Sequence, residues 1–171
     1  YQEALRVRRD HYGKEDHPDI ASTLYSLGLV LFEQDMFELP KECFFDGLRV
    51  RLKLLGRNHH VVAILWYNIA TIYFESGEDD KTIEFYKEAL RVERESLGED
   101  HPDVVLTLQH IAQVLQQLGM LDEAVKYFQD ALRIKRKREE RNMGSEAKIL
   151  NQIGNVYLQQ GDVGNMMGSY I

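Results

Sequence analysis

Apolar residues recur along the chain at spacings of three and four positions, which is the period of an amphipathic α-helix. The spacing is clearest in three segments, whose apolar positions are Leu24, Leu27 and Leu31, then Trp66, Ile69 and Tyr73, then Leu108, Ile111 and Leu115. A second helical pattern follows each segment after a turn, as at Asp122 to about Lys137. Gly77 and Gly119 stand in those turns, where glycine suits the left-handed conformation that ends a helix. The pattern therefore predicts pairs of helices.

Two strings recur with one period over the whole chain. HPDIASTL at 17–24 returns as HHVVAILW at 59–66 and as HPDVVLTL at 101–108, in steps of 42 residues. The opening string YQEALRVRR returns three times in altered form, and each copy contains a Leu-Arg pair: Leu5-Arg6, Leu48-Arg49, Leu90-Arg91 and Leu132-Arg133. Such self-similarity is the signature of a repeat protein. We therefore expect an all-α, right-handed α-solenoid of antiparallel helix pairs.

The period also gives the expected domain organisation, a single solenoid over residues 1–171. Complete repeats are expected at 17–58, 59–100 and 101–142, with the end of a truncated repeat at 1–16 and the start of another at 143–171. The sequence thus reads as beginning and ending within a repeat. Pro18 and Pro102 are expected in the first turn of their helices, where the missing N–H costs nothing, and Pro40 near the start of a second helix.

Several segments resemble the tetratricopeptide repeat, most fully Trp66-x2-Ile69-Ala70-x2-Tyr73 followed by Thr82-x3-Tyr86-x2-Ala89. Small residues recur where the two helices of a unit approach closely, at Gly28, Ala70, Ala112 and Gly154. The usual unit has about 34 residues and often ends in proline. This chain has Leu52, Arg94 and Arg136 at that position, so the second helix can continue, which accounts for the longer period. That period and the LGEDHPDVVLTL linker at 97–108 are similar to the kinesin light chain type of repeat.

Composition and charge narrow the classes of function. The net charge of −7 disfavours a nucleic-acid backbone as partner, and an RNA-binding helical repeat would need a basic groove. The longest apolar run, 61–67, is far shorter than the ~20 residues of a membrane span, so no membrane partner is expected. Cys43 is the only cysteine and cannot form an internal disulfide, which points to a reducing, cytoplasmic location.

The sequence contains no recognisable catalytic motif, and we predict no catalytic residues, no cofactor and no enzyme activity. His17, His59 and His101 stand once in each repeat, and a ladder of metal ligands is conceivable. Zinc binds nitrogen ligands at ~2.0–2.1 Å, whereas equivalent residues of stacked repeats lie at least ~8–10 Å apart. We therefore expect these histidines to organise helix starts, and predict no metal site.

One basic cluster runs from Arg133 to Arg138 and continues to Arg141. A nuclear localisation signal or a polyanion-binding patch would have this composition. So would the solvated face of an extended second helix, particularly with Glu139 and Glu140 beside it. The second interpretation is the one we favour.

By resemblance to tetratricopeptide repeats, the first helices line a concave groove, and residues off their core stripe are the candidates for binding. The candidate peptide-binding residues are Tyr25, Leu29, Phe32, Ile64, Tyr67, Thr71, Phe74, Gln109, Gln113, Gln116, Lys148, Asn151 and Asn155. The alternative is that the aromatic residues among them only pack. Adjacent residues on a helix lie ~100° apart, so we expect Trp66 to face the core and Tyr67 the groove.

These features predict a protein–protein interaction scaffold. The partner is expected to be a peptide or helix bound in the groove, as in a kinesin light chain-like cargo adaptor. Kinesin light chains bind tryptophan-acidic peptides through basic side chains, and Lys148 is the only basic residue among the candidates. The alternative function is a structural spacer or self-associating array within a larger protein, possibly a signalling ATPase, in which exposed solenoid ends form a homo-oligomer.

Overall fold

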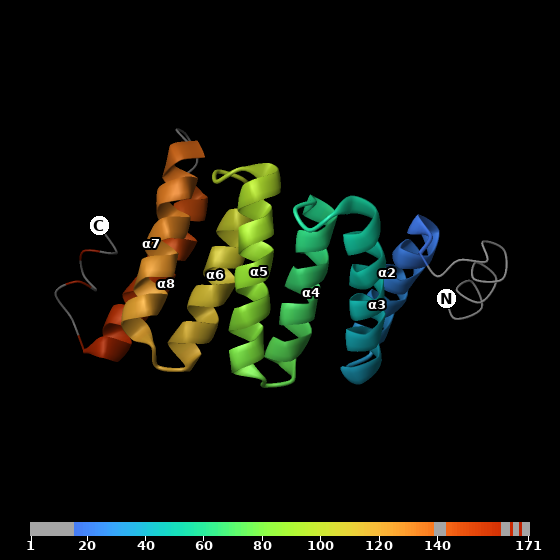
Figure 1. Ribbon diagram of the computed structural model, residues 1–171. Coiled ribbons are helices and arrows are strands. Elements are labelled where there is room, and N and C mark those ends of the chain that lie inside the picture. The colour runs from blue at the N-terminus through green and yellow to red at the C-terminus, as the bar shows by residue number, and fades with distance from the viewer. Residues whose placement is uncertain (1–15, 139–142, 162–164, 166–167, 169–171) are drawn as a thin grey trace. The chain divides into compact units, whose positions relative to one another are not determined.

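The computed structural model describes residues 16–138, 143–161, 165 and 168. Every regular element within these ranges is an α-helix (Figure 1), which confirms the predicted all-α fold. The helices are α2 (Pro18–Phe32), α3 (Glu38–Leu55), α4 (His60–Glu75), α5 (Asp79–Leu97), α6 (Pro102–Gln117), α7 (Leu121–Arg138) and α8 (Met143–Gln160). The even-numbered helices are the first members of the predicted pairs. Most of the fragment predicted at 1–16 lies outside the described residues.

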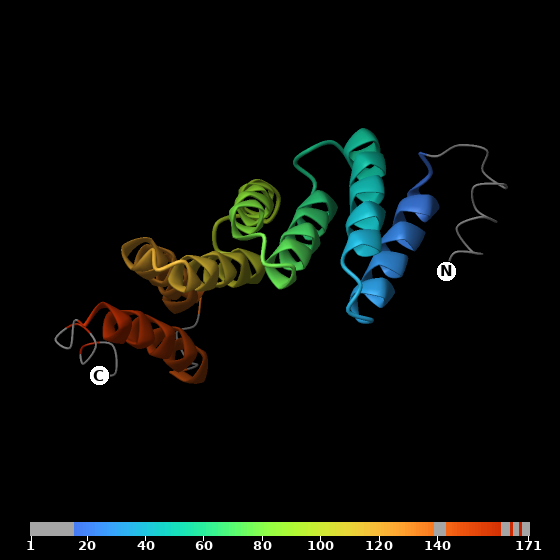
Figure 2. The ribbon, with the colours of Figure 1, turned by 90° about the horizontal axis from the view of Figure 1, so that it is seen from below.

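The chain divides into two compact units, one ending at Val92 and the other beginning at Glu93. In the first unit α2, α3, α4 and the start of α5 follow one another as neighbouring helices (Figures 1 and 2). Their shared core contains Phe44 and Leu48 of α3 together with five residues of α4, namely Val62, Leu65, Ile69, Ile72 and Tyr73. Burial of this apolar area is the main stabilising contribution.

The second unit is built around α6, α7 and α8. α7 packs against both of the other helices. The fully buried side chains include Leu108, Ile111 and Leu115 of α6, Phe128 of α7 and Ile149 of α8. The three predicted core positions of α6 are therefore confirmed.

Two predicted core positions, Leu31 and Trp66, are only half-buried. The deepest residues of α4 include Leu65 and Ile72, each one position before a residue of the predicted stripe. The reason is that α4 has helices on two flanks, α3 and α5, so its buried face is wider than a single stripe. Trp66 packs at the edge of this core.

Three first helices start in the same way. His17, His59 and His101 each precede the first turn in an extended conformation, and each Nδ1 accepts the backbone N–H two residues further on at 3.2 Å. This is the N-cap contact usually made by Ser, Thr, Asp or Asn. The predicted role of these histidines at helix starts is confirmed. Pro18 and Pro102 occupy the first turn, as expected.

The recurrent Leu-Arg pair has a structural role in the first unit. Arg49 pairs with Asp16 at 3.1 Å, and Arg91 donates to Asn58 at 3.4 Å. Asp16 and Asn58 are equivalent residues, each just before the start of a first helix. The arginine therefore ties a second helix to the loop before its own partner helix. Lys53 also bonds to Asp16 and, with Arg49, lowers the pKa of this carboxyl.

Close approach of α2 and α3 leaves no room for a side chain at position 28, where a small residue was expected. A Cβ added to Gly28 would lie 2.6 Å from a ring carbon of Phe44, whose side chain is 1% exposed and cannot easily move. Gly28→Ala should therefore lower the free energy of unfolding by about 1–2 kcal/mol, because overpacking of about 1–3 kcal/mol outweighs the gain in helix propensity of about 1 kcal/mol. Urea unfolding followed by circular dichroism measures the change.

Gly47 of α3 provides a matched control, since it is also a buried helical glycine. Its added Cβ would meet nothing nearer than 3.6 Å, an ordinary contact. Gly47→Ala should be neutral or stabilising by up to about 1 kcal/mol. Equal effects of the two substitutions would contradict the close-packing explanation.

Candidate interaction surface

All predicted groove residues lie on first helices, and none of them is fully buried. In the first unit α2 carries Tyr25, Leu29 and Phe32, and α4 carries Ile64, Tyr67, Thr71 and Phe74. Ile64 is 40% exposed, and the other six are half-buried. In the second unit α6 carries Gln109, Gln113 and Gln116, which are half-buried, and α8 carries Lys148, Asn151 and Asn155, which are exposed.

The aromatic residues of the first unit combine packing with exposure. Tyr25 contacts the ring of Phe44 at 5.8 Å, and Phe32 contacts that of Phe37 at 6.4 Å. Tyr25 therefore packs partly against α3, and Phe32 against the residue just before α3, as the alternative interpretation required, and both side chains are half-buried.

Tyr67 is half-buried rather than open. Its ring lies edge-on to Tyr86 of α5 at 5.3 Å, while Trp66 stacks on Phe85 at 5.4 Å. The expected choice between a core-facing Trp66 and a groove-facing Tyr67 was too simple, because consecutive residues of α5 contact both. Thr71 also contacts Tyr86, and the two hydroxyl groups are hydrogen-bonded at 3.1 Å. Burial raises the pKa of Tyr86, although its hydrogen bond with Thr71 opposes the shift.

In the second unit side-chain amides join α6 to α8. Nε2 of Gln109 donates to Oε1 of Gln152 at 2.9 Å, and Nε2 of Gln116 donates to Oε1 of Gln159 at 2.8 Å. Sequence reasoning missed Gln152 and Gln159. Both pairs have the same separation in sequence, one residue more than the repeat period, and they lie two helical turns apart. That recurrence was the available signal.

One face of α8 remains exposed beside these amide pairs. Lys148, Asn151, Asn155 and Leu158 follow one another at helical spacing, and all four are exposed. Leu158 is 59% exposed. Burial lowers the pKa of His110 of α6, and the positive charge of the nearby Lys148 lowers it further. This face offers amide donors and acceptors between a cation and an apolar side chain.

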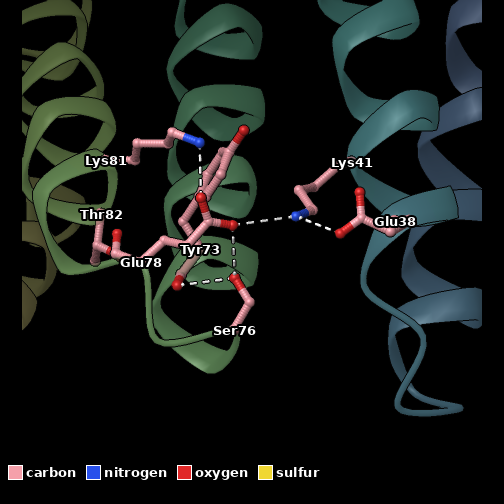
Figure 3. A network of polar contacts seen from close by, with 7 residues as sticks. All are labelled: Glu38, Lys41, Tyr73, Ser76, Glu78, Lys81 and Thr82. Carbon is pink, nitrogen blue, oxygen red and sulfur yellow. Dashed lines mark hydrogen bonds and ion pairs between the residues drawn. The ribbon is translucent and has the colours of Figure 1, made fainter.

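A polar network lies elsewhere in the first unit, around Tyr73 (Figure 3). Lys41 of α3, 8% exposed, pairs with Glu38 at 2.7 Å and with Glu78 at 3.3 Å. Lys81 pairs with Glu78 at 2.6 Å, and both ammonium groups lie about 5 Å from the Tyr73 ring centroid. The hydrogen bond to Glu38 is the main cause of the raised pKa of Lys41. The hydrogen bond with Lys81 is the main cause of the lowered pKa of Glu78.

We interpret this network as structural, because it joins α3 to the turn between α4 and α5. A hollow of about 650 Å³ lies beside it, but both lysines already have carboxylate partners. Substitutions at equivalent repeat positions indicate this pair, although the pattern of the repeat did not predict it. Lys41 stands where the following repeats have Ile83 and Val125, and Glu78 stands where its neighbours have Met36 and Met120. An oppositely charged pair therefore stands where the equivalent residues of other repeats are apolar, and it joins α3 to the α4–α5 turn.

The basic run beginning at Arg133 carries acidic partners where it is described. Arg133 pairs with Asp130 and Arg136 with Glu146, each at 3.1 Å, and Lys137 pairs with Asp100. Residues 139–142 lie outside the described residues. The paired side chains agree with the solvated-face interpretation. Within the described ranges no three His, Cys, Asp or Glu side chains come together as potential metal ligands.

Comparison with known proteins identifies the repeat. The sequence profile of the tetratricopeptide repeat matches residues 61–137. This segment belongs to the tetratricopeptide repeat family. Solved structures extend the fold over nearly the whole chain, and the predicted kinesin light chain-like type is confirmed at the level of fold. No curated protein sequence matches significantly. Among the described residues no helix is both long and apolar enough to cross a membrane.

Three solved structures illustrate the likeness in fold. BtubC (BKLC) from P. vanneervenii has a TM-score of 0.80 at 17% identity over 90% of this chain, which spans 61% of BtubC. The TPR-like repeats of a Podosopora anserina protein assigned as a kinesin light chain give 0.80 at 16% identity, covering 98% of this chain and 82% of the other. MamA has a TM-score of 0.70 at 14% identity, and the match covers 98% of this chain and 81% of MamA.

Proposed function

We propose that the chain is a protein–protein interaction scaffold, a cytoplasmic adaptor module without enzyme activity that binds a peptide or helix on the exposed faces of its first helices. The observation that carries the proposal is the exposed stripe Lys148, Asn151, Asn155 and Leu158 on α8, beside the bonded amides of α6. The likeness in fold to kinesin light chain repeats supports the adaptor role.

The chemistry of the two units favours two kinds of contact. A side-chain amide can donate to a backbone C=O and accept from a backbone N–H, so Asn151 and Asn155 suit an extended peptide backbone. Partly exposed rings such as Tyr25 and Tyr67 offer rigid apolar area at small entropic cost. Lys148 is the only basic side chain of the exposed α8 stripe, which favours partners that are not defined by acidic residues.

Selection from a random peptide library displayed on phage tests this proposal. Peptides enriched on the 171-residue chain should bind it saturably in fluorescence anisotropy. The double variant Asn151→Ala and Asn155→Ala should weaken binding roughly tenfold or more, since interface anchors commonly cost above 1 kcal/mol each. Both side chains are exposed, so the melting temperature should stay within a few degrees of wild type.

Lys126→Ala is the matched control, because Lys126 is exposed on the second helix α7. It should leave peptide affinity unchanged. Failure to enrich any peptide, or equal loss of affinity in the control, would contradict binding through the first helices.

A further inference from the structure

The hollow of about 650 Å³ in the first unit is bordered by one face of α3 and by the turn between α4 and α5. Glu42, Phe45 and Asp46 of α3 line it, at helical spacings that place them on one face of the helix. The helices that border this hollow lie wholly within the described residues. The proposed peptide-binding stripe on α8 uses none of these side chains, so the hollow is a separate surface.

Negative charge exceeds positive charge around this hollow. Its lining contains four carboxylates and two ammonium groups, and both ammonium groups, those of Lys41 and Lys81, are engaged in the network of Figure 3. Glu42 and Asp46 are exposed and have no ion-pair or hydrogen-bond partner among the described residues. Burial raises the pKa of the nearby Cys43, and the charges of these two carboxylates raise it further. The hollow therefore attracts a cation.

The other repeats show which side chain an acidic residue at the position of Asp46 binds. Glu88 of α5 and Asp130 of α7 are its equivalents, and each pairs with the arginine three residues later at 3.1 Å. In α3 that arginine is Arg49, which instead pairs with Asp16 at 3.1 Å. A carboxylate that binds a guanidinium group in two other repeats is therefore available beside the hollow.

Two aromatic side chains of the hollow add contacts that suit a guanidinium group. Phe45 is 36% exposed, and its equivalents Lys87 and Gln129 are polar, so the repeat itself does not require a ring at this position. Tyr73 is only 9% exposed, yet its hydroxyl group forms no hydrogen bond with a described residue, and no dashed line reaches it in Figure 3. A guanidinium group stacks flat on an aromatic ring and donates several hydrogen bonds from its edge. The two aromatic residues offer a partner for each of these contacts.

We propose that the hollow between α3 and the α4–α5 turn is a docking site for a basic segment of a partner protein, which inserts an arginine side chain. The guanidinium group stacks on Phe45, pairs with the carboxylates of Glu42 and Asp46, and donates to the hydroxyl oxygen of Tyr73. A metal ion does not fit, because within the described ranges no three His, Cys, Asp or Glu side chains come together as ligands. The site is independent of the peptide-binding function proposed above.

A fluorescein-labelled peptide with three arginines separated by glycine-serine spacers is the probe. It should bind the 171-residue chain saturably in fluorescence anisotropy at low ionic strength, and more weakly as salt is added. Citrulline has nearly the same shape as arginine but no charge, so a citrulline version should bind roughly tenfold more weakly or worse. A lysine version should bind about threefold more weakly or worse, because an ammonium group cannot stack flat on a ring or form a bidentate pair.

Matched variants test the protein side. Glu42→Gln combined with Asp46→Asn should weaken binding of the arginine peptide roughly tenfold. Asp80→Asn combined with Glu84→Gln makes the same change in net charge outside the hollow and should leave the affinity nearly unchanged. All four side chains are exposed, so both double variants should melt within a few degrees of wild type. Tyr73→Phe removes the unbonded hydroxyl group and should weaken binding about threefold without lowering the melting temperature.

Carboxyl labelling locates the bound probe. Labelling with a carbodiimide and glycine ethyl ester, read out by mass spectrometry, should show that the peptide protects Glu42 and Asp46 but not the exposed Glu123 of α7. The double variant Asn151→Ala and Asn155→Ala should bind the arginine peptide like wild type. Failure of the peptide-binding proposal for α8 is thereby distinguished from failure of this one.

Four outcomes would overturn the proposal. They are equal binding of the citrulline or lysine peptide, undiminished binding to the Glu42→Gln and Asp46→Asn variant, equal loss in the Asp80→Asn and Glu84→Gln control, and equal protection of Glu123. Self-association in sedimentation that the first double variant abolishes would assign the hollow to a second copy of this chain instead.

Discussion

Replacing Phe85 with alanine should lower the free energy of unfolding of the first unit by about 3 kcal/mol. The ring contacts Phe45 of α3 and both Trp66 and Tyr73 of α4, at centroid distances of 5.9, 5.4 and 5.2 Å. Deletion of a fully buried phenylalanine costs about 3–5 kcal/mol. Phe85 is only half-buried, so the lower end of that range applies.

Urea unfolding measures the effect, and the chain contains its own reporter. Trp66 is the only tryptophan and stacks on Phe85, so its fluorescence follows unfolding of this site directly. Phe85→Leu, which retains most of the apolar volume, should cost about 1 kcal/mol. Glu84→Ala changes the exposed neighbour and should stay within about 0.5 kcal/mol of wild type. A loss below 1 kcal/mol in Phe85→Ala would show that α5 is held to α4 mainly by other contacts.

Much of the fold could be predicted because local sequence signals repeat. Apolar spacing gave the helices, and His17, His59 and His101 marked three helix starts because an N-cap acts on the adjacent turn. A small residue at position 28 was also expected from the resemblance to tetratricopeptide repeats, but the exclusion of even a Cβ follows only from the contact with Phe44.

Contacts between repeats could not be predicted from periodicity alone. The pairs Gln109–Gln152 and Gln116–Gln159 join residues that are not equivalent in the repeat, because neighbouring helices meet along their flanks. The Lys41–Glu78 ion pair depends on two substitutions in different repeats. Neither substitution alone predicts an ion pair. Equivalent positions show which residues share a role, but spatial packing decides which residues meet.

Glu93 is the clearest example of a residue whose role the pattern concealed. Arg51 and Lys135 stand at the equivalent positions, so the sequence pattern predicts a solvent-exposed charged residue there. In the structure Glu93 is 4% exposed. Thr107 of α6 donates to its Oε1 at 3.0 Å, while Oε2 has no hydrogen-bond partner among the described residues. Burial, with a smaller contribution from the charge of Asp103, raises its pKa from 4.5 to about 7.

This raised pKa predicts a pH-dependent stability with a definite sign. Between pH 4.5 and 7 the folded chain retains a proton on Glu93 that the unfolded chain has lost, so stability falls as the pH rises through this range. Below about pH 4.5 the loss is absent, and above pH 7 it is complete. At about 1.4 kcal/mol per pKa unit, the shift corresponds to roughly 3 kcal/mol as an upper estimate.

Glu93→Gln should therefore unfold like wild type near pH 4.5 and be more stable by about 2–3 kcal/mol at pH 8, because the amide needs no buried charge. Urea unfolding of both proteins across this range measures the difference, in which the opposing effects of other carboxylates such as Asp16 cancel. Thr107→Val should act in the opposite direction. It removes the hydroxyl that stabilises the charged form, so it should cost more at pH 8 than at pH 4.5. Parallel pH profiles for wild type and Glu93→Gln would mean that water reaches Oε2 and that the carboxylate is charged at little cost.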